Sequence, residues 1–488
     1  MEWMSPTDAS FLHIEGPNTP MHIGGVSIFE GPAPAFERLE EMVASKLDAV
    51  PRYRQKVRFV PLALERPVWV DDPHFNLGYH LRHTALPAPG TEAVLRRTAA
   101  RIFAQHLDRR KPLWEIWMVE GVSENRWALL SKVHHSMVDG VSATDLMTVM
   151  FDDTPPQPPE QAWQPAPEPS NAELVLRSLT HLAASPAEQV RVVRAAMRRP
   201  RASLEQALAL VRGLSSTTGL LRPLGSSSLT GSIGPHRTWS TAYVHLSDVK
   251  AIRSTLGGTV NDVVLTSVAA GLRDLLQSRG ESVEGRGVRV LVPVSVRRPG
   301  ERGVYNNQVS AMLPTLPVGT EDPVERLGSV RTQMDKLKQS GQAVAGEVLT
   351  SLSGFAPPLL LALGGRLAAR SPNLGVQTGV TNVPGPQQPL QTLGRRLLES
   401  FPFVPLIGNV RISIAIFSYN GGLYFGVTGD YDSSRDIDVL TAGVERGVAE
   451  LLRLSQPADG AGERAAPQRR KSRAPAARSV GAPPTQRA

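Results

Sequence analysis

A change of hydrophobic period occurs at the stretch Ser131-Lys132-Val133-His134-His135-Ser136-Met137-Val138-Asp139-Gly140. The apolar run Trp127–Leu130 before it is typical of a buried strand, whereas Val141–Phe151 after it carries apolar residues at helical spacing. The sequence therefore predicts a corner between a strand and a helix that carries two adjacent histidines, an aspartate and a glycine. Reactive side chains are often held at such corners by the rigid elements on either side.

The two histidines cannot both face the same cavity. On an extended backbone neighbouring side chains point to opposite faces, so only one of His134 and His135 faces a given site. A neutral imidazole accepts a proton near neutral pH, which makes either one a candidate general base. Asp139 would hold the turn or the imidazole, and Gly140 lets the backbone bend sharply. The alternative, a core histidine beside a helix-capping aspartate, is commoner for an isolated histidine, but four such residues within seven favour a reactive site.

Composition places the chain with soluble globular proteins. Its 488 residues suffice for two domains with sizeable cores, and 41% are hydrophobic while 20% are charged. There is no cysteine, so disulfides, cysteine-ligated zinc and a cysteine nucleophile are excluded. No secretion signal is evident in Met1–Ser10, and the longest apolar run, Phe355–Leu363, is far shorter than the roughly 20 residues that span a bilayer. We expect a cytoplasmic protein. Peripheral contact with the inner face of the plasma membrane is an open alternative.

The positive charge is concentrated at the end of the chain. The net charge is +8, and seven basic residues with no acidic one follow Glu463, which leaves about +1 for the rest. The nearly neutral body argues against a nucleic-acid partner. The Ala/Pro/Arg tail is typical of a disordered segment, either a solvated tail or one that binds anionic lipid headgroups.

A proline-rich stretch, Asp152–Glu173, interrupts the pattern of helices and strands and indicates a linker. Amphipathic segments follow at Ala172–Ala184 and Pro186–Arg212, and the second has arginines beside its apolar stripe. These helices would bridge two domains or lie on a membrane surface. Elsewhere we expect strands at Val26–Phe29, Lys56–Pro61, Val68–Val70, Leu77–His83, Trp114–Val119, Trp127–Val133, Ala242–Leu246, Val288–Val292, Val410–Ser418 and Leu423–Thr428, and helices at Ala35–Leu47, Thr91–His106, Ser247–Leu256 (capped by Ser247), Asn261–Arg279, Pro323–Lys338, Val344–Leu352 and Ile437–Leu454.

Other polar residues are candidates for supporting roles. Arg297 is the best candidate to pair with Asp139 across the two domains, the alternative being a surface arginine beside Arg298. Thr381 and Asn382 precede a Val-Pro-Gly-Pro turn and are candidates to donate to an oxyanion formed in acyl transfer. Thr259 is expected to cap a helix with Asp262 three residues on. His13, His22, His80 and His83 lack a convincing set of partner ligands, so we interpret them as ordinary.

The pattern His-His-x-x-x-Asp-Gly at 134–140 resembles the signature of the coenzyme-A-dependent acyltransferase superfamily. Further segments make the chain similar to the bacterial wax ester synthase/diacylglycerol acyltransferase family: Ser5–Leu12, Pro112-Leu113-Trp114, Asn261-Asp262, Pro293–Arg297 and Asn382–Pro386. The similarity extends to about Leu454. We assign Pro112-Leu113-Trp114 a structural role, as the entry of a strand with a core tryptophan.

The resemblance implies an α/β fold of two similar mixed-sheet halves, like chloramphenicol acetyltransferase, joined by a crossing helical linker. On this plan residues 1–152 form the N-terminal acyltransferase half, 153–236 the linker, 237–455 the C-terminal half and 456–488 a disordered basic tail.

The resemblance also implies transfer of a long-chain acyl group from acyl-coenzyme A to diacylglycerol, giving triacylglycerol, with fatty alcohols as further acceptors. It makes His135 the proton acceptor and His134 its neighbour in the motif. Asp139 and Gly140 become structural, and Asn261 and Asp262 support the site. Acyl-coenzyme A is a substrate, so no cofactor and no metal are expected, and a membrane or lipid-droplet surface is a candidate partner.

The chain lacks the signature motifs of several other enzyme classes. The chain has no Gly-x-Ser-x-Gly elbow, phosphate-binding loop or dinucleotide fingerprint, and without an elbow or a cysteine direct attack within a ternary complex is simpler than a covalent acyl-enzyme. A metal-dependent hydrolase would use His135 and Asp139, but it lacks a third ligand at sensible spacing. The other alternative is a non-catalytic lipid-binding protein on the same fold.

Overall fold

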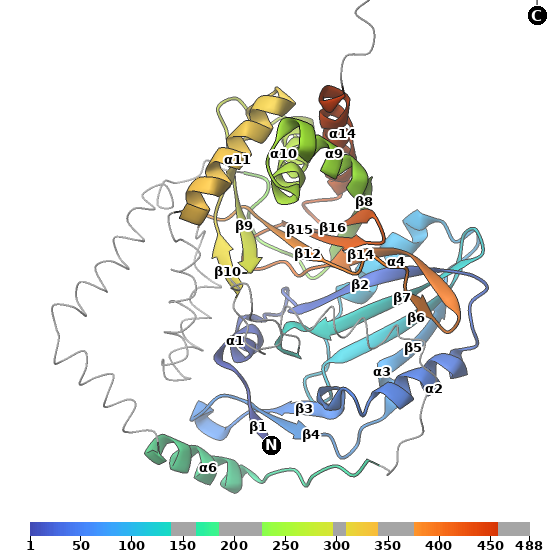
Figure 1. Ribbon diagram of the computed structural model, residues 1–488. Helices are drawn as coiled ribbons and strands as arrows, with labels where there is room; N and C mark the ends of the chain where they lie inside the picture. Colours follow the sequence, from blue (N-terminus) through green and yellow to red (C-terminus); the bar gives the residue numbers. More distant parts are fainter. Residues whose placement is uncertain (138–162, 185–226, 296–308, 340–374, 457–488) are drawn as a thin grey trace, which may run out of the picture. The chain divides into compact units, whose positions relative to one another are not determined.

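The structure, a computed structural model, describes residues 1–137, 163–184, 227–295, 309–339 and 375–456. The chain separates into one unit, Met1–Ser455, and a second, Gln456–Ala488. The helices and strands that are described belong to the first unit, and the strands form three sheets there (Figure 1). The mixed α/β class predicted from the sequence is confirmed.

The first large sheet is built around β2 and β7. Its order is β13 (Gln391–Thr392), β14 (Arg395–Phe403), β2 (His22–Glu30), β7 (Arg126–His134), β6 (Trp114–Val122) and β5 (Leu81–Ala85). Neighbouring strands are antiparallel except β5 and β6, which are parallel. Helices α2 (Phe36–Lys46) and α4 (Glu92–Phe103) bury one apolar stripe each against the residues of this sheet. Because β2 and β7 pair in register over nine residues, His22 lies opposite His134.

Smaller elements surround the first part of the chain. Strands β1 (Glu2–Trp3), β4 (Val68–Asp71) and β3 (Gln55–Arg58) form a small sheet, and α1 (Pro6–Ile14) follows β1 directly. Helix α6 (Asn171–Ala184) packs its buried Leu174 on Val68 and Val70 of β4. The remaining short helices are α3 (Leu77–His80), η1 (Pro51–Arg54), η2 (Pro61–Ala63) and η3 (His135–Met137), the last three being 3-10 turns.

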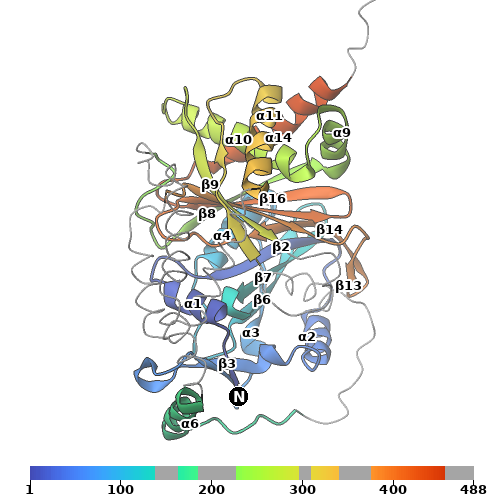
Figure 2. The ribbon, with the colours of Figure 1, turned by 60° about the vertical axis from the view of Figure 1, so that its left-hand side comes forward.

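The second large sheet has helices on one face. Its order is β10 (Val309–Met312), β9 (Val288–Ser295), β12 (Thr378–Pro384), β15 (Ile412–Tyr419), β16 (Gly422–Asp430) and β8 (Arg237–His245), and β11 (Thr315–Leu316) pairs with β9. Strand β12 runs parallel to β9 and β15, so this sheet is also mixed. Helices α9 (Leu246–Leu256), α10 (Val260–Ser278), α11 (Pro323–Gln339) and α14 (Ile437–Ser455) lie on the face away from β2 and β7 (Figure 2).

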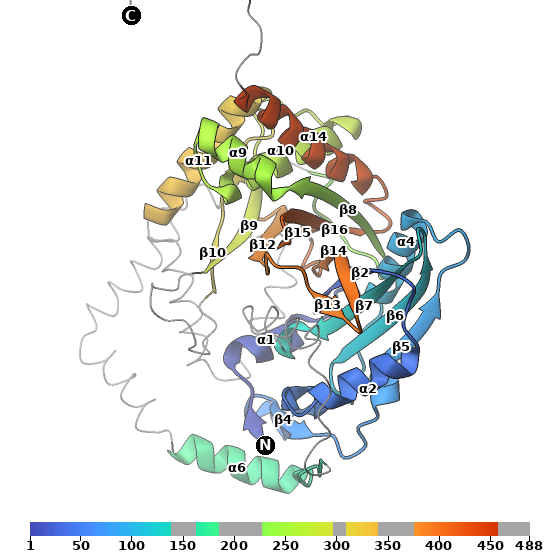
Figure 3. The same cartoon turned by 45° about the vertical axis from the view of Figure 1, so that its right-hand side comes forward.

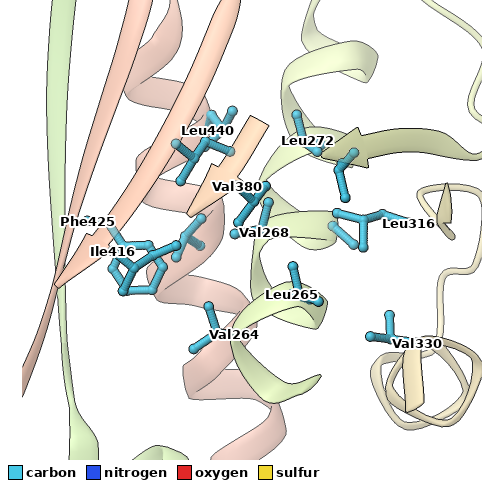
Figure 4. Close-up of a cluster of buried hydrophobic side chains, with 14 of the residues drawn as sticks. Val264, Leu265, Val268, Leu272, Leu316, Val330, Val380, Ile416, Phe425 and Leu440 are labelled. Atoms are coloured by element: carbon cyan, nitrogen blue, oxygen red, sulfur yellow. The ribbon is translucent and has the colours of Figure 1, made fainter. Parts of the chain in front are cut away.

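Helix α10 is the centre of the second core. Its Val264, Leu265, Val268 and Leu272 are fully buried and point among the sheet and the neighbouring helices (Figure 4). Each such aliphatic side chain contributes roughly 1.5–3 kcal/mol when it leaves water. The helix begins with a capping box in which Thr259 and Asp262 each bond the other's backbone N–H. The predicted cap is therefore confirmed, and it fixes where the polar residues Asn261 and Asp262 enter the core.

A strand from late in the chain belongs to the first large sheet and packs on the second. Strand β14, which follows β12 in the chain, pairs with β2 and not with the second sheet (Figure 3). Phe401 and Phe403 of β14 share one core with Trp239, Phe417 and Tyr424 of the second sheet. Strand β14, from the predicted C-terminal half, thus belongs to the sheet of the predicted N-terminal half. The domain boundaries themselves stay a prediction.

Two local predictions are wrong. Leu77–His80 of the expected strand is a helical turn, because Asn76 accepts from the N–H of Gly78 and caps it, and only Leu81–Ala85 is extended. Ser247 is not a cap: α9 begins one residue earlier, at Leu246, and the Ser247 hydroxyl donates to Asp248 instead. The predicted helices Val141–Phe151, Pro186–Arg212 and Val344–Leu352 lie outside the described residues.

Within the described part of the chain, no helix has both the length and the apolar character needed to cross a bilayer.

Candidate active site

The two motif histidines lie at the C-terminal end of strand β7. This strand lies between β2 and β6 in the first sheet and ends at His134, and η3 begins with His135. The backbone N–H of His134 donates to the carbonyl of Leu113 at 2.9 Å, so the segment Pro112-Leu113-Trp114 holds the end of the strand. Trp114 is 1% exposed and starts β6, which confirms a strand entry with a core tryptophan.

His134 is a buried residue with a defined set of partners. It is 1% exposed, and its Nδ1 lies 2.7 Å from the hydroxyl of Ser136 and 3.1 Å from the backbone nitrogen of the same residue. Because that backbone N–H donates to Nδ1, the proton of the neutral imidazole is on Nε2. Burial lowers the pKa of His134, and the nearby Glu15 offsets only part of this effect. His134 is therefore neutral at physiological pH.

Nε2 has no hydrogen-bond partner among the described residues, but Glu15, the residue after α1, lies near it. Glu15 Oε2 lies 3.7 Å from His134 Nε2, and the carboxylate also accepts from the Met21 N–H at 3.0 Å and from Arg109 Nε at 2.8 Å. Burial raises the pKa of this carboxyl, but the neighbouring His106 and His134 and the N–H of Met21 bring it well below its ordinary value. Glu15 was not predicted from the sequence, because it lies 119 positions before His134 and no local pattern marks it.

Two further buried polar residues, His22 and Lys132, lie near His134 in the first sheet. Both cap the C-terminal end of α4: His22 Nε2 lies 2.7 Å from the carbonyl of Phe103, and Lys132 Nζ donates to the carbonyl of Ile102 at 3.2 Å. The Ile102 carbonyl also accepts from the backbone N–H of Gln105, and the positive charge of Lys132 at this end of α4 is favoured by the helix dipole. His22 and Lys132 are each 0% exposed. Lys132 shares the face of β7 that carries His134, so this histidine points into the layer between sheet and helix.

His135 has a different environment. It is partly buried, its ring stacks on Phe11 with centroids 3.9 Å apart, and its backbone N–H donates to the carbonyl of Met21 at 2.8 Å. Nδ1 is buried and has no hydrogen-bond partner within the described residues. Burial, with a smaller contribution from His134, lowers the pKa of His135 to about 4. The imidazole is therefore a free base at neutral pH.

A second polar group forms in the other large sheet. Asn382 of β12 donates through Nδ2 to Oδ1 of Asn261, at the start of α10, over 3.4 Å. Asp262 is 1% exposed, and its Oδ2 accepts from Thr259 while Oδ1 is buried without a hydrogen-bond partner among the described residues. Thr381 is partly buried next to Asn382 on the same strand. The structure thus brings Asn261 and Asn382 together, and it brings Asp262 into the capping box.

Three predicted site residues, Asp139, Gly140 and Arg297, lie outside the described residues. The proposed pairing of Arg297 with Asp139 stays a prediction. Among the described residues, no group of three or more acidic, histidine or cysteine side chains could hold a metal ion.

The fold is shared by acyltransferases and condensation domains. The wax ester synthase/diacylglycerol acyltransferase from Marinobacter aquaeolei is similar with a TM-score of 0.63 at 24% identity, over 93% of this chain and 99% of that chain. The first condensation domain of the calcium-dependent antibiotic synthetase is similar with a TM-score of 0.58 at 19% identity, over 93% and 96% of the two chains. The chain therefore shares the fold of these two proteins.

The family follows from the sequence comparisons. The sequence model of the wax ester synthase/diacylglycerol acyltransferase catalytic domain matches residues 4–264, and that of the WS/DGAT C-terminal domain matches residues 305–452. A Mycobacterium tuberculosis protein named a probable diacylglycerol O-acyltransferase, tgs1, is 36% identical over 464 residues, covering 93% of this chain and 97% of the relative. The chain belongs to the wax ester synthase/diacylglycerol acyltransferase family and is an acyltransferase.

Proposed function

We propose that this protein transfers a long-chain acyl group from acyl-coenzyme A to diacylglycerol, forming triacylglycerol, with His135 as general base. The observation that carries the mechanism is the state of His135. Its ring is partly buried, clamped by Phe11, and neutral at physiological pH because burial lowers its pKa to about 4. The acceptor is proposed from the relative in Mycobacterium tuberculosis, whose name specifies diacylglycerol.

The reaction is proposed to proceed within one ternary complex. His135 takes the proton of the acceptor hydroxyl while the hydroxyl oxygen forms a bond to the thioester carbonyl carbon. The tetrahedral oxyanion then collapses, the carbon–sulfur bond breaks, and the coenzyme A sulfur takes the proton back from the imidazolium. We assign the proton transfer to Nε2, because Nδ1 is out of contact with solvent. The chain has no cysteine, so a thioester with the enzyme is excluded.

Thr381 and Asn382 are proposed to stabilise the oxyanion. The carboxamide of Asn382 has two N–H groups, and the bond to Asn261 uses one of them. Among the described residues the second N–H has no partner, so it can donate to developing charge, while Asn261 fixes the direction of the amide. A donor that is oriented before the reaction needs no reorganisation in the transition state.

Three further parts of the proposal concern partners. Fatty alcohols are proposed as second acceptors, in line with the name of the Marinobacter aquaeolei structure, which includes wax ester synthase. No cofactor is proposed, because His135 and the two substrates suffice for the chemistry. We propose that the protein is cytoplasmic and meets its water-insoluble acceptor at a membrane or lipid-droplet surface, in peripheral contact.

The test is an assay of coenzyme A release from palmitoyl-coenzyme A with a panel of acceptors. The panel consists of a 1,2-diacylglycerol, hexadecanol, glycerol and no acceptor, and the lipid product is identified by mass spectrometry. We expect triacylglycerol and stoichiometric coenzyme A with diacylglycerol, and wax ester with hexadecanol.

A matched pair of histidine variants separates catalysis from folding. His135→Ala should lose transfer, whereas His83→Ala, which removes an exposed histidine on β5, should keep it. Wild-type transfer by a folded His135→Ala protein would end the general-base assignment. Palmitoyl-coenzyme A bound by the wild type without turnover for any acceptor would favour the lipid-binding alternative.

A further inference from the structure

One short segment of the N-terminal region contacts both motif histidines (Figure 1 shows α1 beside the end of β7). Phe11 of α1 stacks on the ring of His135, and Glu15, one turn later, faces Nε2 of His134. Beyond the helix, Met21 accepts the backbone N–H of His135 through its carbonyl. The N–H of Met21 itself donates to Glu15. Glu15 therefore lies 3.7 Å from His134. It also accepts from the N–H of Met21, whose carbonyl holds the backbone of His135.

The arrangement around His134 fixes its tautomer. Because Nδ1 of His134 accepts from the backbone of Ser136, Nε2 carries the proton, and Oε2 of Glu15 lies 3.7 Å from Nε2, beyond hydrogen-bond distance. A carboxylate facing that proton favours this tautomer over the other one, in which Nδ1 would carry a proton against the Ser136 N–H. The turn His134–Ser136 is thereby held in one arrangement, and His135 is its middle residue.

We infer that Glu15 is a positioning residue for acyl transfer: through His134 and Met21 it fixes the orientation in which His135 meets the substrates. This inference rests on the proposed function for its kinetic consequences. It adds a residue outside the histidine motif, 119 positions earlier in the chain, to the machinery.

A purely structural role for Glu15 makes different predictions. In that case its importance would come from the ion pair with Arg109, which also donates to the carbonyl of Leu12 and so anchors the end of α1. Loss of Arg109 would then be as harmful as loss of the carboxylate. Under the positioning role the two variants differ, because Arg109 acts on His134 only through its charge, whereas the Glu15 carboxylate lies beside Nε2.

The kinetic experiment compares Glu15→Gln with Arg109→Met in the full chain. Glu15→Gln keeps the size of the side chain and removes its charge. We expect its kcat to fall at least about tenfold, since a misplacement of 1 Å at a catalytic group can cost on the order of 100-fold. The KM for palmitoyl-coenzyme A should change less than kcat, because the imidazole rather than the binding of the thioester is disturbed. Arg109→Met should keep most of the wild-type kcat at a temperature where all three proteins are folded. Equal losses in both variants that follow their melting temperatures, or a change in KM alone, would overturn the inference.

A second readout is independent of turnover. Side-chain ¹⁵N spectra of histidine-labelled protein report the tautomer of His134, whose signals are assigned from their loss in His134→Gln. The wild type and Arg109→Met should both show the proton on Nε2, and Glu15→Gln should shift or broaden these signals. Unchanged His134 signals in Glu15→Gln would contradict the positioning role even if the wild type proved inactive with every acceptor. Inactivity of the wild type together with a changed His134 would instead refute the proposed function alone.

Discussion

The rings of Phe11 and His135 lie parallel, with centroids 3.9 Å apart and an angle of 16° between their planes. Helix α1 thus covers one face of the proposed base. Glu15 directly follows this helix, so residues near the start of the sequence shape a site whose motif lies more than 100 residues later. Phe36 and His83 form a similar stack, at 4.9 Å and 4°, away from the motif.

This pair of stacks gives the first prediction. Phe11→Leu removes an aromatic contact of about 0.5–1.5 kcal/mol from the proposed base. If that contact orients His135 in the transition state, kcat should fall about 2- to 10-fold. Phe36→Leu removes a comparable stack from a histidine without a catalytic role and should leave kcat unchanged. Steady-state rates of coenzyme A release for both variants provide the measurement, and equal effects would show that the stack contributes only to stability.

The second prediction concerns pH. Burial and the neighbouring His134 lower the pKa of His135 to about 4, so its base form persists well below the ordinary histidine range. The activity should therefore show no inflection near about 6.5, the unperturbed value, and should fall only as pH approaches the lowered pKa. Rates measured with saturating substrate across this range test the point, and a clear inflection between about pH 6 and 7 would contradict the assigned environment.

The same shift has a consequence for stability, with a definite sign. The unfolded chain takes up a proton on His135 as the pH falls through about 6.5, while the folded protein does so only near its lowered pKa. Stability linked to this residue is therefore fully present above the unfolded value and declines between the two. Because the lowered pKa of Glu15 acts in the same direction on acidification, the contribution of His135 is isolated by comparing urea unfolding of the wild type and His135→Asn.

The third prediction addresses the buried Lys132. Its ammonium donates to the carbonyl of Ile102 and lies 3.8 Å from Glu115, and burial lowers its pKa to about 8. Lys132→Met leaves Glu115 as a buried unpaired charge, so we expect a loss of about 3–5 kcal/mol in unfolding free energy. The double variant Lys132→Met/Glu115→Gln should recover part of that loss. Denaturant unfolding gives both values, and a single variant as stable as the wild type would mean that the pair is not buried as described.

The fourth prediction uses two threonines at helix starts. Thr259 caps α10 with a side-chain bond to the N–H of Asp262, whereas Thr91 precedes α4 without any side-chain cap bond. Thr259→Ala should therefore cost about 1 kcal/mol, within a usual range of about 0.5–2, and Thr91→Ala clearly less. Thermal and urea unfolding of the two variants measure the difference. An equal cost would remove the capping box as the reason for the start of α10.

The fifth prediction tests the junction of the two large sheets. A Cβ added to Gly426 of β16 would stand 1.7 Å from the carbonyl oxygen of Pro402 in β14, so the backbones themselves touch there. Gly426→Ala should destabilise the fold by at least about 1–3 kcal/mol, the usual cost of overpacking. Gly379→Ala in β12 is the control, because its Cβ would meet only the Ser413 hydroxyl at 3.8 Å. If both variants unfold at the same denaturant concentration, the close approach is not part of the folded protein.

Local sequence was sufficient for much of the fold. The strands predicted at Val410–Ser418 and Leu423–Thr428 form β15 and β16, a hairpin whose turn holds Asn420 and Gly421 at positive φ. The predicted cap of Thr259 and Asp262 begins α10. Local patterns predicted the wrong structure where a neighbouring side chain formed a capping hydrogen bond. Asn76, for example, caps a helical turn within an expected strand. The wrong cap at Ser247 has the same origin, because α9 starts where β8 ends rather than where a serine is available.

The sequence by itself determined the class of the protein, because the histidine motif, the periodicity of its flanks and the turn residues depend on neighbours only a few positions apart. Only the tertiary structure decided that β14 joins the first sheet, that His22 lies opposite His134, and that Glu15 faces it. These relationships join residues that are 100 or more positions apart, and such contacts follow from strand order and packing. No short-range steric or hydrogen-bonding preference encodes them, so a carboxylate such as Glu15 becomes recognisable only when the chain has brought it to the imidazole.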